Sequence, residues 1–243
     1  MSTGTSLPVA GLMSRPELIV AELFGPTFQG EGPSTGQQAV FVRLSRCNLR
    51  CPGCDTPYTW DWSRFDPQAE ARRLGIDDIA AWVLARSAQL VVITGGEPLL
   101  QQRSLIGLVQ TLAEHGRLVE IETNGTIAPD PALVAAAKAF NVSPKLSSFA
   151  SPMDRPIVSS ALECLAGTGK AVFKFVATTL ADLDDTAGLV AEHQLDPVWV
   201  MPAATSSGEV MAGLRNLGDE VLRRGWNLTG RLHLLLWEDT RGR

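Results

Sequence analysis

Short apolar runs alternate along the chain with longer segments in which apolar residues recur every three or four positions. The short runs are rich in β-branched and aromatic residues, which favours β-strands. We expect strands at residues 17–24, 39–44, 90–94, 118–123, 171–176, 198–201 and 232–237. The longer segments predict helices in the second half of 68–86, at 101–114, at 132–139 and from Ser206 to about Gly225.

Strands that alternate with helices are typical of βαβ units, in which the strands form a parallel sheet. The pattern gives six or seven strands, fewer than the eight that close a (β/α)8 barrel. The sequence therefore predicts an α/β fold with an incomplete parallel barrel of the (β/α)6 type. No repeat or low-complexity linker divides residues 17–243, so we expect one domain after a frayed tail at residues 1–16.

Polar or glycine-rich segments follow the apolar runs at residues 47–56, 95–97, 123–125, 143–145 and 201–202. Right-handed crossovers bring the carboxyl ends of parallel strands to one edge of the sheet. Active sites of parallel barrels lie at this edge. We therefore expect the five segments to meet there and to form a single site.

Composition and charge restrict the class of protein. The 243 residues are 45% hydrophobic and include six Trp, enough for a large core. A net charge of −5 argues against binding to a nucleic-acid backbone. The chain lacks an apolar run of about 18 residues, which argues against a membrane span. Three of the four cysteines are clustered, so we expect a reducing cytoplasm rather than a disulfide scaffold.

The clustered cysteines are Cys47, Cys51 and Cys54, on a loop that contains Gly and Pro. Thiolates are soft ligands that suit zinc, cuprous copper or iron–sulfur clusters. A structural zinc site needs four ligands, usually as two short pairs far apart in the sequence, whereas this run supplies three. A 4Fe–4S cube held by three cysteines keeps one iron free for a substrate or cofactor. The alternatives are a zinc site completed by Cys164 or a histidine, or three buried thiols without a metal.

Two further stretches carry polar candidates. Gln29 and Glu31 lie in a segment, 25–33, that is too rich in Gly and Pro for regular structure, and both could present their side chains to a ligand. Arg43 ends a predicted strand just before the cysteines. The alternation of that strand leaves open whether Arg43 faces the site or solvent.

The histidines and the fourth cysteine favour ordinary roles. His115 and His193 lie near predicted helix ends, where we expect them to be solvated. His233 lies between leucines in a predicted strand, where a core histidine with satisfied hydrogen bonds is expected. Cys164 is interpreted as an inert small hydrophobe in a short helix.

The Cys-x3-Cys-x2-Cys run resembles the radical S-adenosylmethionine (SAM) superfamily. In that superfamily the open iron binds SAM, and an electron from the cluster cleaves a carbon–sulfur bond to give a 5′-deoxyadenosyl radical. Five further motifs follow one order: Gln29-Gly30-Glu31-Gly32, Arg43, Thr94-Gly95-Gly96-Glu97-Pro98, Glu122-Thr123-Asn124-Gly125 and Ser143-Pro144-Lys145. With Asp55-Thr56 after the last cysteine, they resemble the 7-carboxy-7-deazaguanine synthase family over residues 18–243.

The resemblance implies a carbon–nitrogen lyase of queuosine and deazapurine biosynthesis. Its substrate would be 6-carboxy-5,6,7,8-tetrahydropterin, and its products 7-carboxy-7-deazaguanine and ammonia. A 4Fe–4S cluster, SAM and Mg²⁺ are the implied cofactors, and no side chain of the protein is implied to be catalytic. Mg²⁺ prefers oxygen ligands such as a Thr hydroxyl.

The resemblance also implies roles for individual residues. The cluster ligands are Cys47, Cys51 and Cys54, and the Mg²⁺ ligand is Thr56. The substrate-binding residues are Phe28, Gln29, Gly30, Arg43, Thr94 and Arg243. The SAM contacts are Gly53, Cys54, Asp55, Gly96, Ser143, Pro144, Lys145, Met201, Pro202, Ala203 and Ala204.

One position departs from the superfamily pattern. An aromatic residue usually precedes the last cysteine, where this chain has Gly53. Tyr58, Trp60 or the backbone alone would then cover the SAM adenine. The resemblance further implies a homodimer and a transient electron donor such as flavodoxin. Two other functions stay open: a glycyl-radical activase, which acts on a protein, and a zinc-stabilised binding protein without catalysis.

Overall fold

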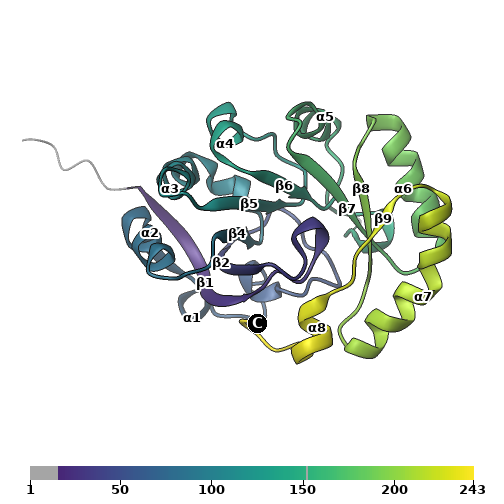
Figure 1. Cartoon of the computed structure of the whole chain (residues 1–243), viewed down its shortest axis with the longest axis horizontal. Coiled ribbons are helices and arrows are strands. Elements are labelled where there is room, and N and C mark those ends of the chain that lie inside the picture. Colours follow the sequence, from purple (N-terminus) through teal and green to yellow (C-terminus); the bar gives the residue numbers. More distant parts are fainter. Residues whose placement is uncertain (1–15, 152) are drawn as a thin grey trace, which may run out of the picture.

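The computed structural model of the chain describes residues 16–151 and 153–243 (Figure 1). All but the last residue of the expected tail, 1–16, therefore lie outside the described residues. The described strands form one nine-stranded sheet in the order β3-β1-β2-β4-β5-β6-β7-β8-β9. They are β1 (Glu17–Phe28), β2 (Gln38–Leu44), β3 (Arg72–Gly75), β4 (Leu90–Gly95), β5 (Leu118–Thr123), β6 (Ala139–Val142), β7 (Ala171–Ala177), β8 (Val198–Pro202) and β9 (Asn227–Leu228).

The sheet is mostly parallel and does not close, which confirms the predicted incomplete barrel. Every neighbouring pair from β2 to β9 is parallel, whereas β1 pairs antiparallel with both β2 and β3. Strands β3 and β9 form its two edges. The predicted number of six or seven strands is too low. Strands β3, β6 and β9 were not predicted, because they have only four, four and two residues, too few to show a periodicity.

The helices are α1 (Pro67–Glu70), α2 (Ile76–Leu84), α3 (Gln102–Glu114), α4 (Pro131–Ala136), α5 (Ser159–Gly167), α6 (Leu180–His193), α7 (Ser207–Arg223) and α8 (Leu232–Trp237). Short 3₁₀ helices lie at Gly32–Ser34, Pro57–Thr59, Pro98–Gln101 and Ser147–Phe149. In Figure 1, α2 to α7 form an arc outside the sheet, and α8 lies apart from it beside the C-terminus. None of the helices in the described ranges combines the length and apolar character needed to cross a bilayer.

Helix α3 shows why the arc forms. Its residues Leu105, Leu108, Val109 and Leu112 recur at helical spacing, and all four are fully buried. They pack in one core with the buried β4 residues Val91 and Ile93. The predicted start of α4 is also confirmed, because Asp130 accepts a hydrogen bond from the Ala132 amide and Pro131 occupies the first turn.

Three predicted element boundaries or types are wrong. The segment 25–28 belongs to β1, whose register shifts between Phe24 and Thr27, since a bulge absorbs the Gly and Pro residues. The helix predicted to reach residue 139 ends at Ala136, and β6 begins at Ala139. Residues 232–237 form helix α8 rather than a strand, because a short apolar run alone does not distinguish the two.

Two predictions for isolated side chains also change. His193 is buried at the end of α6, not solvated, and both of its ring nitrogens lack a hydrogen-bond partner among the described residues. Cys164 lies in α5 as expected, but it is exposed and does not act as a buried hydrophobe. His115 is exposed, as predicted.

Candidate active site

Polar side chains line the face of the sheet opposite the helical arc, which we call the inner face. Val119 and Ile121 of β5 pack in the core with the helices, so the alternate residues Glu120 and Glu122 point to the inner face. On β7 the same alternation directs Lys174 inward. Glu120 and Lys174 are buried, so this face holds charged groups away from solvent.

Glu122 joins two of the predicted substrate-binding residues. Its Oε1 accepts a hydrogen bond from Nε2 of Gln29 at 3.1 Å, and its Oε2 accepts one from Oγ1 of Thr94 at 2.7 Å. Gln29 is buried, and its backbone is held by hydrogen bonds with Gly36 and Gln37. The loop after β1 and the ends of β4 and β5 therefore meet at one carboxylate.

Glu120 occupies a deeper position on the same face. It accepts hydrogen bonds from Ser34 at 2.6 Å, from Lys138 at 2.7 Å and from Asn141 at 3.0 Å. All three donors come from protein side chains, so this carboxylate is satisfied without a ligand. Glu120 therefore belongs to the floor of the site, whereas Glu122 lies nearer the strand ends.

Three predicted substrate-binding residues lie around the last helix and the N-terminal strands. The ring of Phe28 stacks on Trp237 of α8 with centroids 6.2 Å apart, and the guanidinium of Arg243 lies 5.7 Å from the same indole. Arg43, whose direction the sequence left open, donates from Nε to Glu22 at 3.0 Å and is only partly exposed. Its guanidinium lies over the ring of Phe24.

The segment before and within α8 binds the Gln29–Gly32 loop directly. The amide of Leu232 donates to the Gly30 carbonyl at 2.8 Å, and the amide of Gly32 donates to Oγ1 of Thr229 at 3.0 Å. A Cβ on Gly30 would lie 2.1 Å from Nδ1 of His233, so only glycine permits this approach. The expectation of a core-strand histidine is therefore wrong, because His233 lies half-buried at the site. Burial lowers the pKa of His233, although the nearby Glu31 opposes the shift.

The three cysteines are reduced and half-buried on the loop after β2. Burial raises the pKa of Cys47 to about 12 and raises that of Cys51, so a metal bound by these thiols would have to displace their protons. The Leu49 amide and the Trp60 indole donate to the sulfurs of Cys47 and Cys54, each at 3.4 Å. Such donors suit thiolate ligands of a cluster. Within the described ranges, no group of three or more His, Cys, Asp or Glu side chains is arranged to bind a single metal ion.

The Gly95-Gly96-Glu97 motif holds the start of the cysteine loop. Gly95 has φ +138°, and a Cβ on Gly96 would lie 2.1 Å from the carbonyl oxygen of Arg46. The Glu97 amide donates to that carbonyl at 2.8 Å. The buried Glu97 carboxylate accepts from the Asn124 amide at 2.7 Å and from the Thr123 hydroxyl at 2.9 Å. The motif therefore joins the ends of β4 and β5 to the cysteines.

The predicted SAM contacts occupy the same strand ends. The Ser143 amide, just after β6, donates to the carbonyl of Thr123, the last residue of β5, at 2.8 Å. Lys145 donates to the carbonyl and hydroxyl oxygens of Ser143 at 2.8 Å, and burial lowers the pKa of this lysine, although the nearby Cys51 opposes the shift. Beyond β8, the Ala203 amide donates to Ala177 of β7 at 2.9 Å. The remaining predicted contacts lie within these segments or the cysteine loop: Gly53, Asp55, Pro144, Met201, Pro202 and Ala204.

The residues after the last cysteine turn back toward it. The Thr56 hydroxyl lies 3.7 Å from Sγ of Cys54, beside the predicted cluster. Of the two aromatic residues considered in place of the superfamily's usual ring, Trp60 contacts Cys54, whereas the Tyr58 hydroxyl donates to Glu22 at 2.8 Å. A Cβ on Gly53 would meet nothing within 4 Å. Trp60 is therefore the aromatic side chain next to the cysteines.

Two side chains of the site, Lys174 and Arg231, were not named as candidates from the sequence. Glu122 was named there within a motif but without a role, and Trp60 only as a candidate to cover the SAM adenine. The alternation of Glu120 and Glu122 with Val119 and Ile121 was the available signal. It indicates that the two glutamates share a face, but not that this face is an enclosed interior. Arg231 carried no signal, because it precedes a segment interpreted as a strand.

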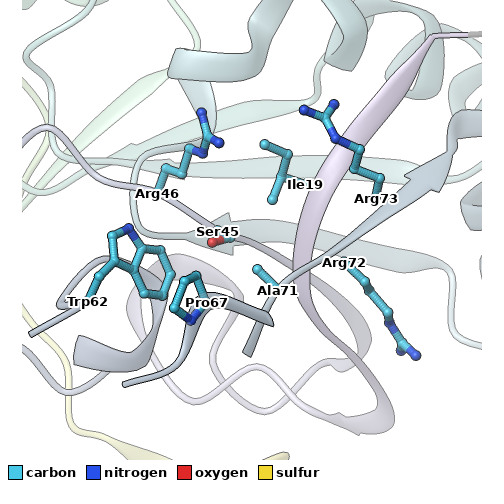
Figure 2. Close-up of a pocket in the computed structure, with 8 residues that line it drawn as sticks. All are labelled: Ile19, Ser45, Arg46, Trp62, Pro67, Ala71, Arg72 and Arg73. Atoms are coloured by element: carbon cyan, nitrogen blue, oxygen red, sulfur yellow. The ribbon is translucent and has the colours of Figure 1, made fainter. Parts of the chain in front are cut away.

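A second feature lies behind the cysteine loop. A pocket of about 200 Å³ is lined by Ile19, Ser45, Arg46, Trp62, Pro67, Ala71, Arg72 and Arg73 (Figure 2). Its lining includes three arginines and no acidic residue. In Figure 2, Arg46 and Arg73 point to the same side of the pocket and Arg72 points away from it. None of the predicted ligand-binding residues lines this pocket, so it is separate from the inner face.

Known proteins resemble the chain in sequence and in fold. A family model described as a 4Fe-4S single cluster domain matches residues 28–129, which include the three cysteines. The 7-carboxy-7-deazaguanine synthase of Pyrobaculum aerophilum is 37% identical over 236 residues, covering 96% of this chain and 100% of that protein. The enzyme of the same name from Halobacterium salinarum is 35% identical over 248 residues, and the match covers 92% of this chain and 92% of that protein.

Solved structures agree with these relatives. The crystal structure of QueE from Escherichia coli matches with a TM-score of 0.68 and 26% identity, covering 89% of this chain and 95% of that one. SuiB of Streptococcus suis, bound to a precursor peptide, shares the fold with a TM-score of 0.56 at 14% identity. Given the identity over nearly the full length of both sequences, the chain belongs to the 7-carboxy-7-deazaguanine synthase family.

Proposed function

We propose that this chain is a lyase that converts 6-carboxy-5,6,7,8-tetrahydropterin to 7-carboxy-7-deazaguanine with loss of ammonia. The names of the relatives support this reaction, and a 4Fe–4S cluster and SAM are the cofactors of the family fold. When bound, the cluster and SAM supply the hydrogen-atom abstraction that begins the ring contraction. The protein binds, orients and shields the reactants.

The arrangement of Gln29, Glu122 and Thr94 carries the proposal. Two residues expected to bind substrate, from distant parts of the sequence, hydrogen-bond to one partly buried carboxylate on the inner face. A pterin carries a ring of amide and amine groups that donate and accept hydrogen bonds. Gln29 and Glu122 offer a complementary set of donors and acceptors.

Arg43 suits the substrate carboxylate, because a guanidinium binds a carboxylate through two parallel hydrogen bonds. Nε of Arg43 donates to Glu22, while the two terminal amino groups of Arg43 have no hydrogen-bond partner among the described residues. Phe28 and Trp237 offer stacked rings that a flat pterin can pack against. Arg243 lies beside them and is the proposed C-terminal contact.

The cluster is proposed to bind Cys47, Cys51 and Cys54, and SAM to bind the adjoining segments 53–55, 143–145 and 201–204 with Gly96. The half-buried thiols, together with the N–H donors to Cys47 and Cys54, fit this ligand set. Mg²⁺ is proposed to bind Thr56 and the substrate carboxylate. A hard cation prefers those oxygen atoms, and it would orient the carboxylate during loss of ammonia.

An anaerobic assay tests the proposal. Reconstituted protein is incubated with SAM, a one-electron reductant and the carboxytetrahydropterin, with and without Mg²⁺, and the deazaguanine product is measured by its ultraviolet absorbance. We expect Mg²⁺-stimulated product formation, and the Thr56→Ala variant should lose most of that stimulation. Iron-loaded protein that cleaves SAM but forms no deazaguanine would contradict the assignment.

Partners and location extend the proposal. We propose a homodimer in the cytoplasm and a transient electron donor such as flavodoxin. Arg46 and Arg73 point to the same side of the pocket beside the cysteine loop, where their positive charge suits a donor of opposite charge (Figure 2). Charge reversal of Arg73 should raise the donor concentration needed for half-maximal rate, while a small chemical reductant should support the same rate.

A further inference from the structure

Four charged side chains from separate segments form a continuous series beside the proposed site: Lys174, Glu31, Arg231 and Asp55. Glu31 accepts from Nζ of Lys174 through Oε2 and from Nε of Arg231 through Oε1, the latter at 3.0 Å. Nη2 of Arg231 donates to Oδ2 of Asp55 at 2.5 Å. Positive and negative groups alternate along the series, so its net charge is zero.

The series is buried at one end and open at the other. The side chains of Lys174 and Arg231 are 7% and 11% exposed, whereas that of Asp55 is 55% exposed. Burial alone would raise the pKa of Glu31, but the charges of Lys174 and Arg231 lower it far below its ordinary value. Glu31 therefore stays ionised, and it holds two cations rather than facing a ligand. Glu31 is not among the residues expected to bind substrate. Its place in the Gln29–Gly32 motif is explained by these two ion pairs.

Arg231 contacts three segments that the proposed function assigns to ligands. Besides Glu31 in the substrate loop and Asp55 after the last cysteine, its Nη1 donates to the Ala204 carbonyl in the proposed SAM segment at 2.6 Å. A guanidinium presents five donors in a fixed plane and can serve three acceptors at once. A lysine ammonium is a compact charge that cannot span the same three positions.

We propose that Arg231 is a positioning residue that couples the substrate loop to the segment following the last cysteine. The inference rests on the proposed function only for the identity of the two ligands. In a reaction begun by a radical, a displacement of about 1 Å between the reactants can slow transfer by about a hundredfold. A loose connection would let the radical be quenched before it reaches the substrate.

The test compares Arg231→Gln, Arg231→Lys and Asp55→Asn in anaerobically reconstituted enzyme. The ratio of released 5′-deoxyadenosine to deazaguanine product measures uncoupled SAM cleavage, and we expect it to rise about tenfold in each variant. Hydrogen–deuterium exchange of the same samples reports loop order independently of turnover. Exchange should increase in both 28–34 and 52–57 for Arg231→Gln, but only in 52–57 for Asp55→Asn.

Arg224 provides a matched control. Its guanidinium also bonds two carboxylates and one carbonyl: Glu220 at 2.6 Å, Asp184 at 2.5 Å and Leu183 at 2.7 Å. Its side chain is 15% exposed, close to the value for Arg231, but it joins α6 to α7. Arg224→Gln should lower thermal stability and leave the product ratio unchanged.

An unchanged product ratio and unchanged exchange at 52–57 in Arg231→Gln would overturn the proposal. If that variant fails to fold, Asp55→Asn carries the test, because its side chain is largely exposed and its loss should not prevent folding. Wild-type enzyme without deazaguanine formation would refute the proposed function instead. The exchange pattern would still decide whether Arg231 couples the two segments.

Discussion

The indole Nε1 of Trp60 donates to Sγ of Cys54 at 3.4 Å, six residues away along the chain. The aromatic residue expected directly before this cysteine is replaced by Gly53, and Trp60 contacts the sulfur instead. Hydrogen bonds to cluster sulfurs favour the reduced state, because they stabilise the added negative charge.

Trp60→Phe should therefore make the reduction potential of the reconstituted cluster more negative. Loss of a hydrogen bond contributing about 1 kcal/mol corresponds to about 40 mV for a one-electron couple. An anaerobic redox titration followed by electron paramagnetic resonance measures the shift. Trp62→Phe is the control, since Trp62 is an exposed ring that lines the separate arginine pocket. Equal potentials in wild type and Trp60→Phe would show that the bond does not tune the cluster.

Gly96→Ala should impair cluster binding. The added methyl group would lie 2.1 Å from the Arg46 carbonyl oxygen and 3.0 Å from Cβ of Cys47, so the start of the cysteine loop must move. We expect iron and sulfide per chain to fall by roughly half or more after reconstitution, because a displaced ligand weakens metal binding by about tenfold.

Gly53→Ala provides the comparison for Gly96→Ala. A Cβ at Gly53 meets nothing within 4 Å, so this variant should keep full iron content. Equal iron loading in the two variants would contradict the role assigned to Gly96.

Glu122→Gln should weaken substrate binding more than it weakens the fold. The amide can keep one of the bonds to Gln29 and Thr94, but it loses the charge on which both donors converge. We expect KM for the pterin to rise about tenfold, with a small change in Tm, since a charged hydrogen bond contributes about 1.5–3 kcal/mol.

Glu120→Gln tests whether that effect is local. Glu120 lies two residues earlier on the same face but is held by Ser34, Lys138 and Asn141. This change should lower the free energy of unfolding by about 1–3 kcal/mol and leave KM nearly constant, because it removes the charged partner of Lys138 from a buried position. The reverse pattern in the two variants would contradict the assignment of the two glutamates.

Glu22 should make stability depend on pH. Burial would raise its pKa, but hydrogen bonds from Arg241 and Tyr58 and the charge of Arg43 lower it below the ordinary value of 4.5. In acid, the Glu22 carboxylate therefore binds a proton more readily in the unfolded chain than in the folded one. The stabilisation is therefore present above pH 4.5 and is lost as the pH falls through the folded-state pKa.

Urea denaturation of wild type and Glu22→Gln over a series of pH values measures this dependence. We expect the variant to be less stable by about 2 kcal/mol near neutral pH, with the difference shrinking in acid. Glu220→Gln is the surface control, and solvent should screen its pairs with Arg223 and Arg224 and give a weaker dependence. A constant difference between wild type and Glu22→Gln at every pH would exclude this role.

The parts of the fold that sequence predicts well are those with a repeated signal. Val91 and Ile93 lie in a continuous apolar run that ends at two glycines, and this pattern is typical of a buried parallel strand near a ligand. Residues 232–237 show the limit of such reasoning. Five of these six residues are leucine or tryptophan, Leu235 and Leu236 are exposed, and only tertiary packing makes the segment helical.

The candidate site is predictable to the extent that its residues occur in motifs. Gln29 and Thr94 were expected from motifs, but the carboxylate that joins them lies on another strand. The polar alternation at Glu122 fits a solvent-exposed face as well as an enclosed one. Arg231 is harder still, because its three partners are separated from it by 27 to 200 positions, and no local pattern reports such distances.

The contacts of Thr229, Arg231 and Leu232 with the Gln29–Gly32 loop have a consequence for biosynthesis. The loop is made early, but its anchoring partners leave the ribosome some 200 residues later. In a nascent chain that has not yet reached α8, the three cysteines would lie beside a Gln29–Gly32 loop that lacks these hydrogen-bond partners. Delivery of iron and sulfide by the assembly machinery is thus expected to succeed best after translation has passed the final helix.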